Sequence, residues 1–253
     1  MIEKDQYRFG IRAVIEAIQS GKEIDKLLIK KDINGELISE LFALVKEMHI
    51  PVQRVPIEKI NRITRKNHQG VIAFLSAVTY YKLDDVVPVF YEEGLNPFVV
   101  VLDGITDVRN FGAIARTCDC AGVNAIVIPE KNSVSVNADA VKTSAGALNY
   151  VPVCREKNLV NAVKTLHNSG YKVIGASEKS SVNYTKVDYT GPVALILGAE
   201  DKGISKDLLK LCDNFVSIPE FGNINSLNVS VAGGVMMYEV VRQRLNDNQN
   251  SNL

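Results

Sequence analysis

The chain has 253 residues, of which 46% are hydrophobic and 23% charged, so it can form one large or two smaller folded domains and is not expected to be disordered. Lysine and arginine together number 29, as do aspartate and glutamate, and this balance excludes nucleic-acid binding through a high overall positive charge. Residues 1–77 carry 13 basic and 10 acidic side chains and the remainder carries 16 and 19, so any basic surface has to be local.

No run of apolar residues reaches the roughly 18 that a membrane span needs, and the charged start MIEKDQYRFG lacks the apolar segment of a secretory signal. Of the four cysteines only Cys118 and Cys120 are close together, and no histidine or second cysteine pair beside them completes a metal site. We therefore expect reduced thiols, a cytoplasmic location, no metal ion and no membrane segment.

The first 77 residues alternate amphipathic helices with short apolar strands, which predicts a small α/β domain. The predicted elements are helices at 11–20, 36–48 and 57–66 and strands at 26–30, 52–55 and 70–77. Residues 78–97 interrupt this alternation with Pro88 and the pair Asn96-Pro97, so we interpret them as a linker with room for one or two helical turns.

From Phe98 onward the alternation resumes with FVVVL, an entirely apolar strand that is typical of a sheet covered on both faces. The predicted strands are 98–102, 124–128, 151–154, 171–176, 193–197 and 214–218, and the predicted helices are 111–122, 137–147, 157–169, 204–211 and 226–245. Strands that alternate with helices predict a mainly parallel α/β sheet over residues 98–253.

A glycine-bounded turn, GAEDKG, follows the apolar strand VALIL. The spacing of Gly198 and Gly203 imitates a phosphate-binding loop, but Ile204 stands where such a loop needs lysine, which weakens the hypothesis of a nucleotide-binding protein. The simpler alternative is that the two glycines only allow the chain to turn and that the turn binds no ligand. Glu200 favours a function, because α/β sheets bind ligands at the carboxyl ends of their strands.

Two further loops after predicted strands carry polar residues. Asn110 stands where the cap of helix 111–122 is expected, and Arg116 follows six residues later on that helix, where an arginine is usually a solvated surface residue. Ser226 and Asn228 precede the last helix and could simply cap it. The three loops together predict a polar site at one edge of the sheet.

No histidine lies in these loops, because His49, His68 and His167 are elsewhere, which argues against hydrolysis by a serine–histidine arrangement. The site must therefore use arginine, glutamate, serine, asparagine and backbone groups on a substrate or cofactor that is already activated.

Taken together and in order, the three loops resemble the SpoU (TrmH-like) family of RNA ribose 2′-O-methyltransferases. The matching segments are NFGAIAR at 110–116, LGAEDKG at 197–203 and IPEFGNINSLNVS at 218–230, while FGIRAVIEAI at 9–18 and HQGVIA at 68–73 resemble the substrate-binding domain of the family. The resemblance covers the whole chain. It is strongest to enzymes that modify a guanosine of large-subunit (23S) ribosomal RNA, with tRNA enzymes as relatives.

This resemblance implies an α/β SPOUT-type domain with a deep trefoil knot over 98–253, preceded by a small α/β (L30e-like) RNA substrate-binding domain over 1–77. It implies S-adenosylmethionine as methyl donor, RNA as substrate and a homodimer. The residues implied to contact the donor are Leu197, Gly198, Gly203, Ile218 and Leu227, and those implied to be catalytic or to position the substrate are Arg116, Asn110, Glu200, Ser226 and Asn228.

Three positions depart from the family pattern: Val108 replaces the usual proline, Asp201 a small residue and Glu220 a methionine. The two carboxylates add charge near the donor. The family role proposed for the arginine at position 116 is that of a base, but a guanidinium group rarely gives up its proton, which favours a grip on the adjacent phosphate instead.

Two surfaces follow from the pattern of the helices. In helix 57–66 the isoleucines face one side and leave a basic face of Lys59, Arg62, Arg65 and Lys66. We expect this face to contact RNA phosphates. The alternative is an ordinary basic surface that contacts only solvent. The last helix carries Gly233, Gly234, Val235, Met236, Met237 and Val240, more small and apolar surface than one sheet face needs, which favours a two-fold dimer.

Besides the 23S rRNA enzyme, the sequence leaves open a tRNA 2′-O-methyltransferase and a non-catalytic RNA-binding or ribosome-assembly protein of the same fold. The intact set of polar residues in the three loops favours an enzyme.

Overall fold

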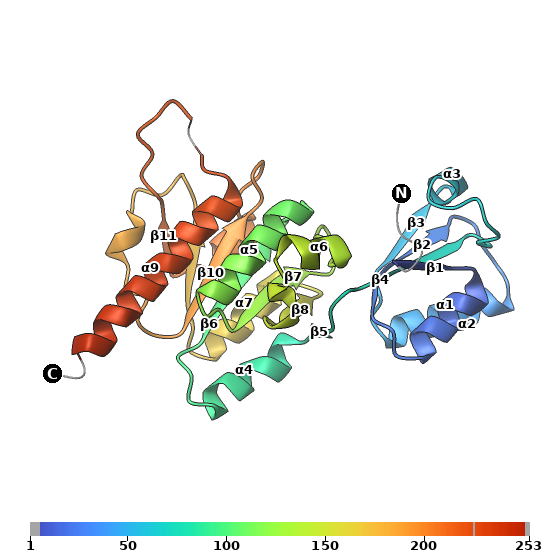
Figure 1. Cartoon of the computed structure of the whole chain (residues 1–253), viewed down its shortest axis with the longest axis horizontal. Coiled ribbons are helices and arrows are strands. Elements are labelled where there is room, and N and C mark those ends of the chain that lie inside the picture. Colours follow the sequence, from blue (N-terminus) through green and yellow to red (C-terminus); the bar gives the residue numbers. More distant parts are fainter. Residues whose placement is uncertain (1–5, 225, 251–253) are drawn as a thin grey trace. The chain divides into compact units, whose positions relative to one another are not determined.

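The computed structural model of the chain describes residues 6–224 and 226–250, which form two compact units (Figure 1). The first unit ends at Thr79 and also includes Ser135–Asp139, and the second begins at Tyr80. Within the described residues, no helix is both long and apolar enough to cross a membrane.

The first unit is built on a four-stranded sheet with strand order β1-β4-β2-β3. Its elements are β1 (Tyr7–Phe9), α1 (Ile11–Gln19), β2 (Ile24–Lys30), α2 (Glu36–Glu47), β3 (Val52–Val55), α3 (Ile57–Asn61) and β4 (Val71–Leu75). β4 pairs antiparallel with both β1 and β2, and β2 pairs parallel with β3. α1 and α2 pack on one face, where Val14 and Leu41 are completely buried, and α3 covers part of the other face through Ile60 (Figure 1).

Two details of this unit differ from the prediction. The helix expected over 57–66 ends at Asn61, because the chain turns back there: the Asn61 Oδ1 atom pairs with the His68 ring and Thr64 accepts a hydrogen bond from the Lys66 N–H group. Strand β1, only three residues long, was not expected at all and exists through its pairing with β4.

The second unit contains a seven-stranded sheet with the order β11-β9-β10-β6-β7-β8-β5, and each of its strand pairs is parallel, as predicted. From Tyr80 onward the elements are β5 (Tyr80–Tyr81), α4 (Leu83–Glu92), β6 (Phe98–Asp103), α5 (Val108–Cys120), β7 (Ala125–Pro129), α6 (Ala138–Thr143), η1 (Ala147–Asn149), β8 (Val153–Glu156), α7 (Leu159–Asn168), β9 (Lys172–Ala176), η2 (Tyr184–Lys186), β10 (Val193–Gly198), α8 (Lys206–Leu209), β11 (Asn214–Val216) and α9 (Val229–Asn250).

Helices cover both faces of this sheet, which explains why its strands are apolar on both sides. α4, α7 and α8 share a core with one face, and α5 and α9 lie side by side on the other (Figure 1). α9 lies so close to β10 that a Cβ atom on Gly233 would come within 2.8 Å of the Leu197 Cδ1 atom. Small residues on α9 therefore serve this close approach.

The residues predicted as a linker over 78–97 instead form β5 and α4. Leu83, Val87 and Phe90 recur at helical spacing and are buried against the sheet, and this burial outweighs the presence of Pro88 inside the helix. The helix predicted over 137–147 is divided into α6 and η1, and the last helix begins at Val229 rather than at residue 226.

Most of the apolar surface of α9 that the sequence suggested for a dimer partner is buried within the chain itself. Gly233 is buried, and Met236, Met237 and Val240 have no exposed surface at all, since they pack into the chain's own core. The apolar side chains that α9 leaves exposed are Val231, Tyr238 and Leu245.

Arg244, in the carboxyl half of α9, connects this helix to two loops of the second unit. Arg244 donates hydrogen bonds to the carbonyl oxygens of Asn96 (2.8 Å), Gly191 (2.9 Å), Pro97 (3.3 Å) and Tyr189 (3.4 Å). These acceptors come from two loops at the amino ends of β6 and β10, so the arginine joins three segments that are distant in sequence.

Replacing Arg244 by methionine should lower the free energy of unfolding by about 1–3 kcal/mol, because four hydrogen bonds from a charged donor, two of them partly buried, are lost together. Arg109→Met, at an exposed position of α5, is the matched control and should change it by less than about 0.5 kcal/mol. Denaturant unfolding measures both. Equal stability of the Arg244→Met variant and the wild type would contradict this interpretation.

Candidate functional site

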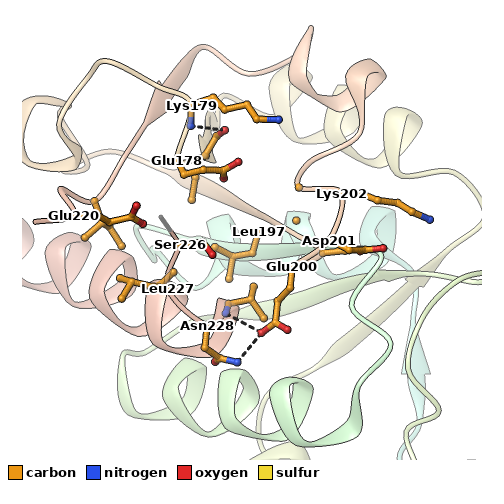
Figure 2. A pocket seen from close by; sticks show the side chains of 18 of the residues that line it. Glu178, Lys179, Leu197, Glu200, Asp201, Lys202, Glu220, Ser226, Leu227 and Asn228 are labelled. Atoms are coloured by element: carbon orange, nitrogen blue, oxygen red, sulfur yellow. Dashed lines mark hydrogen bonds between the residues drawn. The ribbon is translucent and has the colours of Figure 1, made fainter. Parts of the chain in front are cut away.

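A cleft of about 700 Å³ opens at the carboxyl ends of β9, β10 and β11 (Figure 2). Its walls come from residues 176–179 after β9, 197–203 at the end of β10, 216–220 after β11, and 226–232 at the start of α9. This edge is where parallel α/β sheets bind ligands, because the loops that follow the strands converge there. The cleft therefore lies where the sequence predicted a polar site.

The turn after β10 owes its shape to Gly198. A Cβ atom at this position would lie 2.2 Å from the Gly203 carbonyl carbon and 2.2 Å from the Ile204 nitrogen. The turn closes on itself through a 2.7 Å hydrogen bond from the Gly203 N–H group to the Ala199 carbonyl, and Gly203 has a φ of 65°. Both glycines are therefore required by the backbone.

Asn110, Glu200 and Asn228 meet beside the cleft. The Asn228 side-chain amide donates to Glu200 Oε1 at 2.6 Å and to Asn110 Oδ1 at 3.0 Å, and the Asn110 amide donates to Glu200 Oε1 at 3.2 Å. Figure 2 shows the Glu200 carboxylate turned toward Asn228. Side chains from three segments far apart in sequence, the first turn of α5, the turn after β10 and the residue before α9, thus form one hydrogen-bonded cluster. It lies at the edge of the sheet where the sequence predicted a polar site.

Asn228 is at the same time the cap of α9. Its Oδ1 atom accepts hydrogen bonds from the Ser230 N–H group at 3.0 Å and from the Ser230 hydroxyl at 2.5 Å, while the Val229 N–H group points to Glu200 Oε1 at 3.4 Å. The two roles are therefore compatible, since the asparagine side chain caps the helix with its amide oxygen and bonds to the cluster with its amide nitrogen.

Asn110 is not the cap of its helix. Asp107 takes that place, because its carboxylate accepts the backbone N–H groups of Arg109 at 2.8 Å and of Asn110 at 2.9 Å. The Asn110 side chain is thereby free to bond to Glu200. An aspartate followed by a helical pattern was a visible capping signal in the sequence.

Arg116 does not join the cluster. It is exposed on α5 and is not among the residues that line the cleft. Six residues correspond to one and two-thirds helical turns, so Arg116 lies about 120° around α5 from Asn110. Ser226, the fifth predicted catalytic residue, does line the cleft.

All residues predicted to contact a donor line this cleft: Leu197, Gly198, Gly203, Ile218 and Leu227. The cleft also has a surplus of negative charge, with the carboxylates of Glu178, Glu200, Asp201 and Glu220 and the ammonium groups of Lys179 and Lys202. The segment 176–179 was not predicted to take part. Its position directly after the predicted strand 171–176 was the signal that could have indicated it.

Thiol chemistry receives no support from the three cysteines that are buried or half-buried. Burial raises the pKa of the Cys154 and Cys212 thiols to about 12 and raises that of Cys118 further. None of these cysteines lines the cleft. Across residues 6–224 and 226–250 there is also no group of three or more histidine, cysteine or carboxylate side chains that could hold a metal ion.

The basic residues predicted to bind RNA are all exposed on the first unit: Lys59, Arg62, Arg65 and Lys66. Of these four, Lys59 lies within α3, and the other three follow its end at Asn61. The adjacent His68 is buried and structural. Its Nδ1 atom accepts the Gly70 N–H group at 2.9 Å, and its Nε2 atom pairs with Asn61 Oδ1 at 2.9 Å.

Two family profiles match the chain, one over most of each of the two regions that the sequence separates. The profile of the SpoU rRNA Methylase family matches residues 97–238, which include the whole cleft, and the profile for RNA 2′-O ribose methyltransferase substrate binding matches residues 8–81. The chain belongs to the SpoU rRNA methylase family. The fold class predicted from the sequence, an α/β methyltransferase domain preceded by a small substrate-binding domain, is thereby confirmed.

Relatives of this SpoU-family chain extend over nearly its full length. A protein of Staphylococcus saprophyticus is 38% identical over 93% of this chain and 94% of its own length, and one of Bacillus subtilis is 34% identical over 96% and 98%. Both are named as members of the TrmH family of tRNA/rRNA methyltransferases.

Solved structures of the family resemble the SpoU-family chain in fold. The AdoMet-bound rRNA methyltransferase of Sinorhizobium meliloti is 28% identical, with a TM-score of 0.59 over 93% of this chain and 86% of that one. The TrmH/SpoU tRNA modifying enzyme of A. aeolicus is 31% identical, with a TM-score of 0.57 over 67% and 87%. Relatives with rRNA and with tRNA in their names are thus similarly distant.

Proposed function

We propose that this SpoU-family chain transfers a methyl group from S-adenosylmethionine to the ribose 2′-hydroxyl of a guanosine in structured RNA, with 23S ribosomal RNA as the substrate. The observation that carries the proposal is the Asn110–Glu200–Asn228 cluster at the mouth of a cleft that suits the donor. A tRNA substrate is the second candidate, because the similar A. aeolicus protein is a tRNA modifying enzyme.

The cleft fits S-adenosylmethionine in shape and in charge. Ile218 and Leu227 offer apolar surface to the adenine ring, and the turn that Gly198 allows to close forms one wall of the cleft. The surplus of carboxylates suits a ligand that carries a sulfonium and an ammonium group. When bound, the donor supplies a methyl group that is already electrophilic.

The chain's own residues then have to orient the ribose hydroxyl. The two asparagine amides and the Val229 N–H group all bond to Oε1 of Glu200, so we expect Oε2 to accept a hydrogen bond from the substrate. A carboxylate held by several donors keeps one orientation, which positioning of a weak nucleophile requires. To Arg116 we assign a grip on the neighbouring RNA phosphate.

Incubation with isotope-labelled S-adenosylmethionine and RNA from a strain that lacks the gene tests the proposal. We expect label on a single ribose 2′-oxygen of 23S rRNA. Label on tRNA would select the second candidate, and label on a base would contradict ribose chemistry. Tight donor binding without turnover on any RNA would favour a non-catalytic RNA-binding protein. Calorimetry with ATP in place of the donor tests the nucleotide-binding alternative, for which we expect no heat of binding.

We also propose that the protein is a homodimer that associates through α9. The exposed side chains of Val231 (53%), Tyr238 (52%) and Leu245 (58%) are spaced seven residues apart, so they form one apolar stripe along the helix. The Glu200 cluster lies at the amino end of the same helix, which would bring the site close to the interface.

Light scattering at micromolar concentration should give twice the 27.8 kDa of one chain. Replacing the tyrosine at the centre of the stripe, Tyr238→Lys, should shift the protein toward the monomer, because a charge on an apolar interface is costly to bury. Lys164→Glu, an exposed position on the opposite side of the sheet, should leave the mass unchanged. A wild-type mass of one chain would contradict the dimer.

The trefoil knot implied by the resemblance belongs to the same proposal. β11 lies at the edge of the sheet beside β9, whereas α9 packs against α5 and β10. The chain between them therefore returns across the ends of β9 and β10, past the cleft. Such a return is what threading of the C-terminal segment through a loop requires.

The exposed basic residues of the first unit are proposed to hold RNA phosphates. Replacing Lys59, Arg62, Arg65 and Lys66 together by alanine should weaken RNA binding and flatten its dependence on salt, because fewer counterions are released. Affinity for the donor should not change, since the cleft belongs to the second unit. Filter binding at several salt concentrations measures the slope, and an unaltered slope would contradict this assignment.

A further inference from the structure

One face of the sheet in the first unit carries a row of aromatic rings. It is the face opposite α1 and α2, and α3 covers part of it (Figure 1). Tyr7 and Phe74 are direct partners across β1 and β4, with ring centroids 6.4 Å apart, and the Phe9 ring lies 6.1 Å from that of Tyr7. All three side chains are only half-buried, so solvent reaches part of each.

Ammonium groups flank this row on two sides. Lys26 is the β2 partner of Phe74 and places its Nζ atom 5.4 Å from the centre of that ring. Lys66 places its Nζ atom 5.9 Å from the centre of the Phe9 ring. The segment 57–69, which supplies Lys66, has four basic side chains and one acidic side chain. The border of the face is thus positively charged.

Rings on a strand surface with ammonium groups at their edges suit one class of ligand. Unpaired bases stack on aromatic side chains, and the phosphates between them pair with lysine. A purely apolar partner would have to bury the two ammonium groups without compensation, which is unfavourable. The charge of the border therefore favours a single-stranded nucleic acid over an apolar protein surface.

We propose that Tyr7, Phe9 and Phe74, with Lys26 and Lys66, form a platform on which unpaired bases of single-stranded RNA stack. This platform is distinct from the phosphate contacts assigned above to the basic residues around α3, apart from Lys66, which belongs to both. That the bound RNA is the methylated substrate rests on the proposed function. The stacking itself does not.

The sequence provides a direct probe, because the chain contains no tryptophan. Tyr7→Trp places a single indole on the platform. Phe42→Trp is the matched control, since Phe42 lies on the α2 face of the same unit and also has a cation over its ring, Arg54 at 5.2 Å. Oligouridine of about 12 nucleotides is the titrant, a length within the usual range of single-strand sites.

We expect saturable quenching of the Tyr7→Trp fluorescence by oligouridine, weaker at higher salt, and no change for Phe42→Trp. In the wild-type background, Tyr7→Leu combined with Phe74→Leu should weaken oligouridine binding at least about tenfold, because each ring contributes a stacking surface that leucine lacks. Phe42→Leu should leave the affinity unchanged. Circular dichroism confirms that each variant is folded.

Several results would overturn the platform. These are quenching of both indoles alike, binding of oligouridine without quenching of the Tyr7→Trp variant, and absence of any binding. A blue shift that grows with protein concentration before RNA is added would place a second copy of the chain on this face and equally overturn it. Methyl transfer to RNA, measured on the same preparations, reports on the proposed function separately, so failure of the platform and failure of the function are distinguishable.

Discussion

The Gly198→Ala variant is expected to lose affinity for the donor by on the order of a hundredfold. The added methyl group would lie 2.2 Å from backbone atoms of Gly203 and Ile204, which no rotation of a side chain can relieve. The turn that forms one wall of the cleft must therefore move. Displacement of two backbone segments should also lower the free energy of unfolding by about 1–3 kcal/mol or more.

Gly191→Ala is the control for this prediction, because a Cβ atom there would meet no other atom within 4 Å. It should bind donor like the wild type. Calorimetry with S-adenosylmethionine and thermal denaturation measure the two effects. A Gly198→Ala variant with unchanged donor affinity would show that the cleft beside this turn is not the donor site.

Arg116→Ala is expected to reduce methyl transfer at least about a hundredfold while leaving stability and donor binding nearly unchanged. The side chain is exposed and does not line the cleft, so its loss removes neither core packing nor a wall of the proposed donor site. Single-turnover methyl transfer with saturating donor measures the effect. Lys164→Ala, which removes an exposed cation from α7, should remain fully active.

Arg116→Lys separates the two roles that an arginine could have. Lysine keeps the positive charge but loses the planar, two-pronged donor geometry, and its lower pKa makes it easier to deprotonate. If Arg116 grips phosphate, the lysine variant should be nearly inactive at every pH, which is the result we expect. Activity that rises with pH would indicate a base. Wild-type turnover by Arg116→Ala would exclude both roles.

The sequence was informative wherever a local pattern carried the information. The apolar strands from FVVVL to VALIL predicted a parallel sheet covered on both faces, and polar residues just after those strands predicted a site at one edge. Residues at the carboxyl ends of parallel strands converge whatever the details of packing. For that reason Glu200 and Asn228 could be assigned to one place before any contact was known.

The sequence failed wherever the outcome depended on partners far along the chain. β1 is only three residues long, and its partner β4 lies more than sixty residues away, so no local pattern marks it. Tyr80 and Tyr81 form a strand only because β8 provides an edge for them. Short strands have little propensity of their own and depend on the neighbour with which they pair.

The sequence by itself determined the family, the α/β alternation and the part of the cleft that residues 197–203, 218 and 226–228 form, because these follow from the order and period of local segments. Only the tertiary structure decided which of these side chains bond to one another and which lie apart. It gave the helix cap to Asp107 and so left Asn110 for Glu200, it turned Arg116 to another side of α5, and it buried Met236 within the chain. Each outcome depends on how helices rotate and pack against one sheet, which is decided by contacts between segments distant in sequence.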